Sequence, residues 1–430
     1  MNRPDLGPPL RVATPMSDPT LERRVDLDWL RITAFGLLIL FHIGMFYVPW
    51  QWEVKSPRLI PALQIVLEWS APWRLPLLFI LSGAATCFMS RRLAPNRLFA
   101  ARSRYLLPPL LFAVLIIVPP QTYFKVVEQY GYSDSYWRFW LRYLTFDRSF
   151  CRDGHCLLMP NWNHMWFIAY LWIYTALLLC ILHVAPRIVP RLAALSHALV
   201  GWRLLVVPAL VLATGRIALA HFFPETHGLL DDWYLHFVFF LCFLFGFVAL
   251  PDGALTKDFD RLRWVALAAA IICYAIRATY TWHYRGQPIP IEVKVAMAFV
   301  YGFDQWSWIV AALGFAHRHL AHRSGVARQY LTEAVFPYYI IHQTAIVVMA
   351  HELAHWSLPL WCEVTLLVVA TLGVCALTFE LVRRVDWLRP LLGLKTKEPG
   401  VSLGFVRWRA RVAEGSTASV AELVSKAQHH

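Results

Sequence analysis

Apolar stretches long enough to cross a bilayer recur along the whole chain, and short polar segments separate them. An α-helix rises about 1.5 Å per residue, so about 20 apolar residues span the roughly 30 Å hydrocarbon core. The pattern predicts about ten such helices, at residues 28–48, 69–89, 105–124, 164–183, 204–222, 233–250, 264–280, 295–316, 336–350 and 360–381. We therefore expect an all-α fold, a polytopic bundle of transmembrane helices in a lipid bilayer.

The basic residues predict the orientation of this bundle. Residues 90–104, after the second predicted helix, contain five arginines, and a second basic segment at residues 317–328 follows the eighth helix. Loops rich in Arg and Lys stay in the cytoplasm, so these segments and both termini are expected to be cytoplasmic. We expect a cytoplasmic segment at residues 1–27, a membrane domain at 28–382 and a cytoplasmic tail at 383–430, in a multi-pass protein of the inner membrane.

The composition agrees with this architecture. The chain is 58% hydrophobic and only 16% charged, which excludes an ordinary soluble domain. Its net charge of +13 arises in short loops, so it indicates membrane orientation and not binding of nucleic acid. Residues 1–27 are polar and lack the apolar core of a signal peptide, so the first helix is expected to direct insertion. Residues 401–412 are basic and amphipathic, and we expect them on the membrane surface.

Two ionisable residues in the first predicted helix, Arg31 and His42, are candidates for function. Eleven steps of about 100° leave their side chains within about 20° of one helix face, roughly 16 Å apart along the axis. An ionisable group inside a membrane helix costs about 2.5–3.5 kcal/mol on insertion scales and normally faces protein or a polar cavity. The alternative is structural: Asp28 pairs with Arg31 as an anchor, and His42 is a core histidine.

Two other motifs admit different chemistry. Residues 351–355 read HELAH, the spacing of two zinc ligands and a general base on one helix. Asp252, a candidate third ligand, falls in a loop across the predicted membrane, so we expect a chance match and no bound metal. Cys151 and Cys156 fall in an external loop, where an oxidising compartment favours a disulfide. Free thiols, or a metal site that includes His155, are the alternatives.

Four short segments together resemble the acyltransferase 3 family of membrane acyltransferases. They are LDWLR followed by His42, FILSGAATCF with Ser82 and Gly83, HMWFIAYL with His164 and Trp166, and FPYYIIHQT with Tyr339 and His342. Their order over nearly the whole membrane region matches the family, and the resemblance is closest to the branch that succinylates osmoregulated periplasmic glucans. One feature departs from the family: its two arginines before the third helix are often three residues apart, whereas Arg102 and Arg104 are two apart. Arg104 has the family's spacing to Pro108, so the comparison favours Arg104 over Arg102.

The resemblance implies an O-acyltransferase that moves a succinyl or acetyl group from cytoplasmic acyl-CoA, its co-substrate, to a sugar hydroxyl of an extracytoplasmic glycan. No permanently bound cofactor is implied. His42 is expected to be the general base, because imidazole titrates near working pH, and His342 an assisting or orienting group. Guanidinium groups bind phosphate bidentately, so the arginines at the inner face are expected to hold the donor phosphates: Arg31, Arg102 and Arg104. Trp166 is expected on the acceptor side.

Other interpretations stay open at this point. A transporter or channel uses buried charges of the same kind for permeation. Many transporters are built from inverted repeats with broken helices, and the sequence shows no internal repeat, which weakens that alternative. A zinc protease based on residues 351–355 ranks third. The sequence also leaves open whether His42 only takes up a proton or itself becomes acylated.

Overall fold

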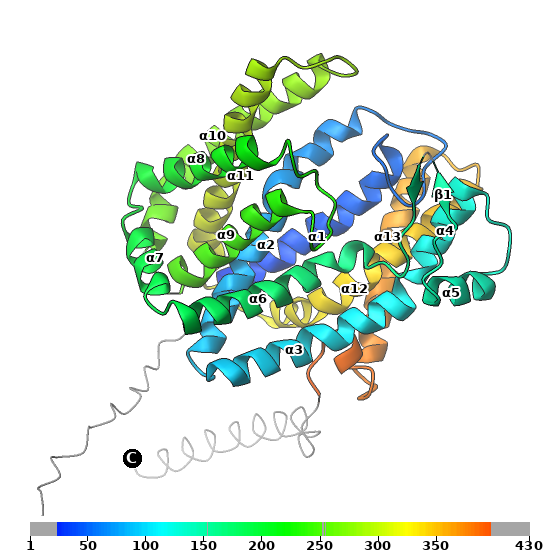
Figure 1. The fold of residues 1–430 in the computed structure, drawn as a ribbon, viewed down its shortest axis with the longest axis horizontal. Coiled ribbons are helices and arrows are strands. Elements are labelled where there is room, and N and C mark those ends of the chain that lie inside the picture. The colour runs from blue at the N-terminus through cyan, green and yellow to red at the C-terminus, as the bar shows by residue number, and fades with distance from the viewer. Residues whose placement is uncertain (1–23, 153, 252, 254, 397–430) are drawn as a thin grey trace, which may run out of the picture.

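The structure is a computed structural model that describes residues 24–396, except 153, 252 and 254. The predicted segment before residue 24, the stretch 401–412 and Asp252 lie outside the described residues. The described chain is almost entirely helical (Figure 1). Its only strands are β1 (Cys151–Arg152) and β2 (His155–Cys156), which form one short antiparallel pair. The all-α class predicted from the sequence is therefore confirmed.

Helices lie at all ten predicted membrane segments. They are α1 (Val25–Tyr47), α2 (Leu63–Ser90), α3 (Pro95–Phe112) continued by the π-helix η1 (Ala113–Ile117) and α4 (Pro119–Tyr130), α6 (Trp166–Val184), α8 (Trp202–Leu219), α9 (Trp233–Ala249), α10 (Thr256–His283), α11 (Ile291–Leu320), α12 (Val326–Ala354) and α13 (Leu360–Val382). The connections contain α5 (Tyr136–Leu144), α7 (Ile188–His197) and the short turns η2 (Asn163–Met165) and η3 (Pro390–Leu392).

Seven of the described helical segments are long and apolar enough to cross a membrane: α1, α2, α3 to α4, η2 with α6, α8, α10 and α13. The apolar helix α9 is shorter, with 17 residues. Helices α11 and α12 are long, but they bury polar side chains such as Asp304 and Gln343. The membrane character of the bundle is thus supported, whereas the number of ten crossings stays a prediction.

Contacts at the two ends of the bundle link segments that the sequence predicts to lie on the same side of the membrane. At one end, the start of α1 meets the end of α9 and the start of α12: Arg24 donates to the carbonyl of Leu250 at 3.3 Å, and Asp28 pairs with Arg328 at 2.5 Å. At the other end, Arg58 donates to the carbonyl of Leu358 at 2.8 Å. Which end faces the cytoplasm stays a prediction.

Two prolines inside α2 explain why its neighbours carry buried polar groups. Proline lacks an N–H, so Pro72 and Pro76 each leave the carbonyl four residues earlier without its helical donor. Arg277 of α10 donates to the first of these carbonyls, that of Glu68, at 3.3 Å. Gln305 of α11 donates to the second, that of Pro72 itself, at 2.7 Å. These contacts fix α10 and α11 against α2.

Two glycines let α2 and α9 approach each other closely. A Cβ atom on Gly83 would lie 1.9 Å from the carbonyl oxygen of Phe243, and one on Gly246 would lie 1.9 Å from that of Ile80. Small residues at such a contact are typical of helix pairs in membranes. Gly83 belongs to the FILSGAATCF segment, so its place in that motif is explained by helix packing.

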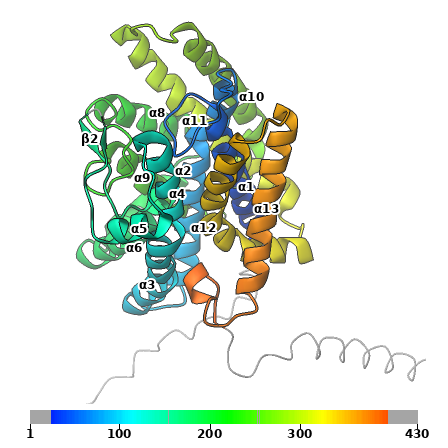
Figure 2. The same ribbon diagram turned by 90° about the vertical axis from the view of Figure 1, so that its right-hand side faces the viewer.

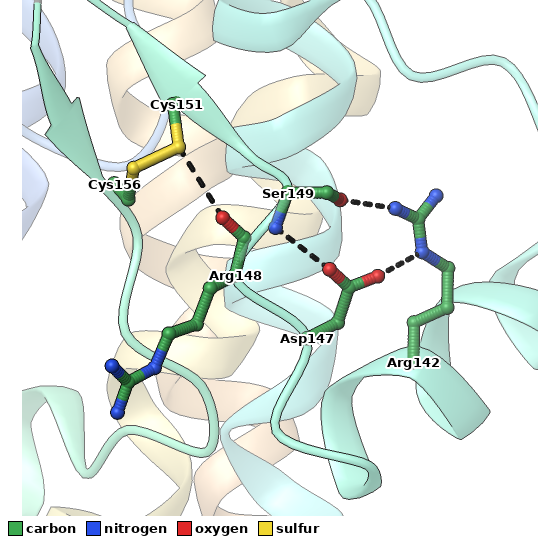
Figure 3. Close-up of a disulfide and its surroundings, with 6 residues drawn as sticks. All are labelled: Arg142, Asp147, Arg148, Ser149, Cys151 and Cys156. Carbon is green, nitrogen blue, oxygen red and sulfur yellow. Dashed lines mark hydrogen bonds and ion pairs between the residues drawn. A yellow bond between two sulfur atoms is a disulfide. The ribbon is translucent and has the colours of Figure 1, made fainter.

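The long connection between α4 and α6 folds as a small aromatic cap that contains a disulfide. Cys151 and Cys156 are bonded to each other, so the disulfide alternative is confirmed and the free-thiol and metal alternatives are wrong. Figure 3 shows the adjoining turn, in which Arg142 pairs with Asp147 at 2.5 Å and also contacts Ser149. The side of α5 that packs inward contributes Phe139 to the cap's own apolar cluster.

Candidate functional site

The site is built around two histidines from helices far apart in the sequence. Nδ1 of His42 on α1 lies 2.9 Å from Nε2 of His342 on α12, and these two helices lie side by side (Figure 2). The two rings are nearly parallel, with their centres 5.1 Å apart and an angle of 11° between their planes. His342 is completely buried, whereas His42 is half-buried. His42 is therefore the more accessible member of the pair.

The partners of His342 determine which nitrogen of His42 is free. Nδ1 of His342 lies 2.7 Å from the carbonyl oxygen of Tyr339, and a carbonyl only accepts, so that nitrogen carries the proton. Nε2 of neutral His342 is then an acceptor, and Nδ1 of His42 donates to it. This assignment leaves the lone pair of Nε2 on His42 without a partner among the described residues, which is the arrangement of a general base oriented by a second group.

A third histidine forms one wall of the site. Nε2 of His164 donates to the carbonyl of Ile340 at 3.1 Å, and its ring meets that of His342 edge-on at 5.2 Å. The hydroxyl of Tyr339 donates in turn to the carbonyl of His164. Nδ1 of His164 lies 3.5 Å from the amide nitrogen of Gln121, which only donates, so both ring nitrogens of His164 have partners. His164 thus holds the start of α6 against α12 and supports the histidine pair.

An amide network behind this wall fixes the start of α4. Gln121 accepts from Asn163 at 3.0 Å and from Gln343 at 3.1 Å, and it donates to the hydroxyl of Thr344 at 2.6 Å. Thr344 donates to the carbonyl of Ile117, the last residue of the π-helix. The irregular turn between α3 and α4 is thus tied to the same stretch of α12 that carries His342.

Arg74, which the sequence reasoning missed, lies beside the histidine pair. Its guanidinium carbon is 4.3 Å from the ring centre of Phe41, and that ring is 5.9 Å from the ring of His42. Only 2% of Arg74 is exposed. The available signal was an arginine between Pro72 and Pro76 inside a predicted membrane helix, because such a charge is costly unless it faces protein or a polar cavity.

The predicted phosphate-binding arginines lie near the opposite end of α1. Arg31 and Arg102 are close enough to Tyr105 to interact with it electrostatically. Arg102 is buried, and it donates to the hydroxyl of Thr86. Arg104 is exposed on α3, so the structure places Arg102 beside Arg31, although the sequence comparison favoured Arg104.

A row of aromatic rings connects this arginine group to the histidines. Tyr105 stacks on Phe336 with ring centres 5.2 Å apart, and Phe336 stacks on Tyr339 at 6.3 Å. The ring of Tyr339 lies 5.9 Å from that of His342. One face of α12 therefore connects the predicted phosphate-binding arginines with the predicted base.

Trp166 packs among other aromatic residues at the start of α6. Its ring lies 4.4 Å from that of His227 and stacks on Phe239 at 5.6 Å, which leaves 8% of the residue exposed. His227 belongs to the loop between α8 and α9, where burial lowers its pKa against the opposing effect of Asp232. Trp166 thus positions this loop, and its ring has little free surface for a sugar.

The HELAH segment forms the last turns of α12, away from the buried pair. His351 pairs with Glu128 at 2.7 Å, Nδ1 of His355 lies 2.8 Å from the carbonyl of His351, and Glu352 is exposed. Among the described residues no three His, Cys, Asp or Glu side chains come together in a group that could hold a metal ion.

Similarity to known proteins extends over most of the chain. The family model described as acyltransferase domain matches residues 24–380. Glucans biosynthesis protein C of Escherichia coli O6:K15:H31 (strain 536 / UPEC) is 22% identical over 395 residues, which cover 87% of this chain and 95% of the relative. The protein of the same name from Escherichia coli O139:H28 (strain E24377A / ETEC) matches with the same identity and coverage. No solved structure matches the chain.

Proposed function

Because the chain belongs to the acyltransferase 3 family of membrane acyltransferases, we propose that it is an O-acyltransferase of the inner membrane that uses acyl-CoA. The acceptor is a sugar hydroxyl of a glycan outside the cytoplasm. The name of the relatives favours a glucan, and the resemblance described from the sequence favours a periplasmic one. The acyl group is succinyl or acetyl. The observation that carries the proposal is the histidine pair, which leaves Nε2 of His42 free to accept a proton.

The proposed reaction is a direct transfer. Nε2 of His42 takes the proton from the acceptor hydroxyl while the hydroxyl oxygen attacks the carbonyl carbon of the thioester. The carbon–sulfur bond then breaks, and the departing thiolate of coenzyme A takes the proton from His42. His342 keeps the His42 ring in place throughout, because it is itself hydrogen-bonded to the carbonyl of Tyr339.

The proposed donor path uses the length of α1. Arg31 precedes His42 by eleven residues, which is about 16 Å along a helix axis. Arg31 and Arg102 would hold the phosphates of coenzyme A at one end, since guanidinium groups bind phosphate strongly. The pantetheine arm would follow the aromatic row of Tyr105, Phe336 and Tyr339 toward the base. This arrangement brings the thioester from the cytoplasmic side to a base near the outer side.

A transporter receives no comparable support from the buried charges. Arg277 and Asp304 form an ion pair at 2.6 Å, and Arg277 also donates to a carbonyl freed by Pro72. These contacts give both charges a role in packing α10 and α11 against α2. A permeation path is therefore not needed to explain them.

Two measurements test the proposed function. Purified protein in lipid nanodiscs, supplied with isotope-labelled acetyl-CoA or succinyl-CoA and a periplasmic glucan, is expected to yield labelled ester, detected by mass spectrometry. Cell-envelope glycans from strains with and without the gene are expected to differ by the same ester. Absence of transfer from both donors to the glucan, together with identical envelope glycans, would contradict the proposal.

A topology experiment tests the direction of transfer. Reporters fused near Arg97 and Arg323 are expected to read cytoplasmic, because these residues belong to the basic loops. A reporter near Gly154, in the disulfide-bonded loop, is expected to read external. A cytoplasmic result at Gly154 would invert the direction and exclude transfer toward the outer side.

A further inference from the structure

Arg74 lies beside the histidine pair, on the side of Phe41. It lies over the Phe41 ring at 4.3 Å, and its Nη1 donates to the hydroxyl of Ser70 at 2.8 Å. Ser70 precedes it by one helical turn on α2, so this bond fixes the direction of the guanidinium. The cation is thus held in place next to His42 by a neutral hydroxyl and an aromatic ring.

The charge of Arg74 has no counterion among the described residues. It forms no ion pair there, and its buried Nε has no hydrogen-bond partner. Removing a cation from water without an anion costs several kcal/mol. A protein keeps such a residue where a ligand or a reaction supplies the missing negative charge.

The position of Arg74 decides which negative group it meets. Its neighbour Phe41 lies ten residues beyond Arg31 on α1, about 15 Å along the axis, so Arg74 is remote from the proposed phosphate site. It is close to His42, where the proposed function places the thioester carbonyl. The group that becomes negative at that point is the carbonyl oxygen.

Resting on that proposed function, we infer that Arg74 is a catalytic residue that stabilises the oxyanion of the transferring acyl group. When the acceptor oxygen bonds to the carbonyl carbon, the carbonyl π electrons move to its oxygen, and His42 holds the acceptor proton. The Arg74 guanidinium donates to this oxyanion through hydrogen bonds that strengthen as the charge develops. The carbonyl re-forms as the carbon–sulfur bond breaks, and the thiolate leaves with the proton from His42.

A second group could supply the negative charge that Arg74 lacks, because a dicarboxylic acyl chain such as succinyl ends in a carboxylate. The two sources predict different kinetics. Oxyanion stabilisation acts on every acyl donor and in the transition state, so it lowers kcat when it is lost. A carboxylate contact exists already in the bound donor and only for succinyl, so its loss raises KM for that donor alone.

The test compares wild-type protein with Arg74→Lys and Arg74→Gln, using acetyl-CoA and succinyl-CoA in nanodiscs. Loss of one oxyanion donor typically lowers kcat about 10²–10³-fold, and we expect Arg74→Gln to show a loss of that order with both donors and little change in KM. Arg74→Lys is expected to keep part of the activity, because it retains the charge without the planar fork. The overturning results are an unchanged kcat or a defect confined to KM for succinyl-CoA.

Two controls keep the outcome interpretable. Arg74→Gln is expected to bind coenzyme A with the wild-type dissociation constant, because the proposed phosphate site is remote; this also shows that the variant is folded. Should Arg74→Gln not fold, Arg74→Ala with added methylguanidinium is the second variant. Recovery of kcat supports the inference, and failure to recover contradicts it.

The same assay separates this inference from the proposed function. If wild-type protein transfers neither acyl group, the proposed function fails together with this inference. If wild type is active and the variants match it, only the inference on Arg74 fails.

Discussion

Two buried arginines, Arg74 on α2 and Arg277 on the neighbouring α10, differ in how their charge is balanced. Arg277 pairs with Asp304 at 2.6 Å, lies 3.9 Å from Glu68, and stacks over Tyr301 at 4.9 Å. Arg74 is also buried, but among the described residues its guanidinium bonds only to the hydroxyl of Ser70 and lies over the ring of Phe41. A charge that the protein neutralises itself contributes to packing, whereas a charge left without an anion beside the histidine pair points to a reaction. The predictions below separate these two regions by their effects on rate and on stability.

The largest effect is expected at the histidine pair and on rate alone. His42→Ala removes the proposed base, and loss of a general base typically lowers the rate about 10²–10⁴-fold. His342→Ala should lower kcat less, since it removes the group that orients His42. Both are measured as acyl transfer in nanodiscs, with unfolding monitored by near-UV circular dichroism. Near-normal transfer by purified His42→Ala would remove His42 from the mechanism.

The second-largest effect is expected at the Arg277–Asp304 ion pair, and it concerns stability. Asp304→Asn leaves the buried Arg277 cation without its main partner, and breaking a buried pair typically costs about 3–5 kcal/mol. The double variant Arg277→Met with Asp304→Leu should be less destabilised, because it removes both charges. Unfolding in mild detergent with increasing denaturant measures the difference.

Arg74 supplies the matched control for that stability measurement. Arg74→Gln removes a buried cation that has no counterion, so its unfolding midpoint should equal or exceed that of wild type. If Arg74→Gln were destabilised as strongly as Asp304→Asn, the contrast between the two arginines would fail. Arg74 would then be a packing residue like Arg277.

The fold was largely predictable, because apolar length in a bilayer leaves few alternatives to helices. The pattern did not reveal the π-helix after α3 or the short helix α5. The polar content of α11 was also hard to interpret from sequence. Gln305 is buried there because Pro76 on α2 leaves a carbonyl without its helical donor. The residue pattern along α11 alone does not show that a carbonyl on another helix lacks a donor.

The site was predictable only where it depends on one helix. The spacing of Arg31 and His42 fixed a common face, and family resemblance added His342. The 2.9 Å contact between His42 and His342 joins residues 300 positions apart, which periodicity cannot predict. Resemblance also favoured Arg104, but helical geometry turns it about 200° from Arg102, and Arg102 is the one that faces the bundle.

A smaller effect is expected at the other end of α1, on donor affinity. Arg31→Ala should weaken coenzyme A binding about 10–100-fold, which corresponds to loss of a charged hydrogen bond of about 1.5–3 kcal/mol. Arg31→Lys should lose less, because it keeps the charge but not the bidentate geometry. Arg102→Lys should follow Arg31, whereas Arg104→Ala should change affinity less, since Arg104 is exposed. Isothermal titration of coenzyme A onto purified variants measures this.

Equal dissociation constants for wild type and Arg31→Ala would contradict the donor role. They would favour the structural interpretation, in which Arg31 anchors the start of α1. A lower protein yield with unchanged binding per molecule would be the signature of that role. The result does not affect the histidine pair, which is about 16 Å away along the helix.

The smallest effect is expected at the HELAH end of α12, the same helix that carries His342. His351→Ala removes a pair with Glu128 at the end of the bundle, where both side chains are partly exposed, and pairs near the surface contribute about 0–1 kcal/mol. Glu352→Ala and His355→Ala alter residues that are exposed. All three variants should therefore retain transfer within about twofold of wild type, and their free energies of unfolding should lie within about 1 kcal/mol of the wild-type value.

Elemental analysis of the wild-type protein should find no stoichiometric zinc at the HELAH segment. The imidazole of His351 is engaged by Glu128, that of His355 by a backbone carbonyl, and Glu352 is exposed to solvent. Zinc bound at one equivalent, and lost together with activity in His351→Ala, would place chemistry at this end of the helix and reopen the protease interpretation.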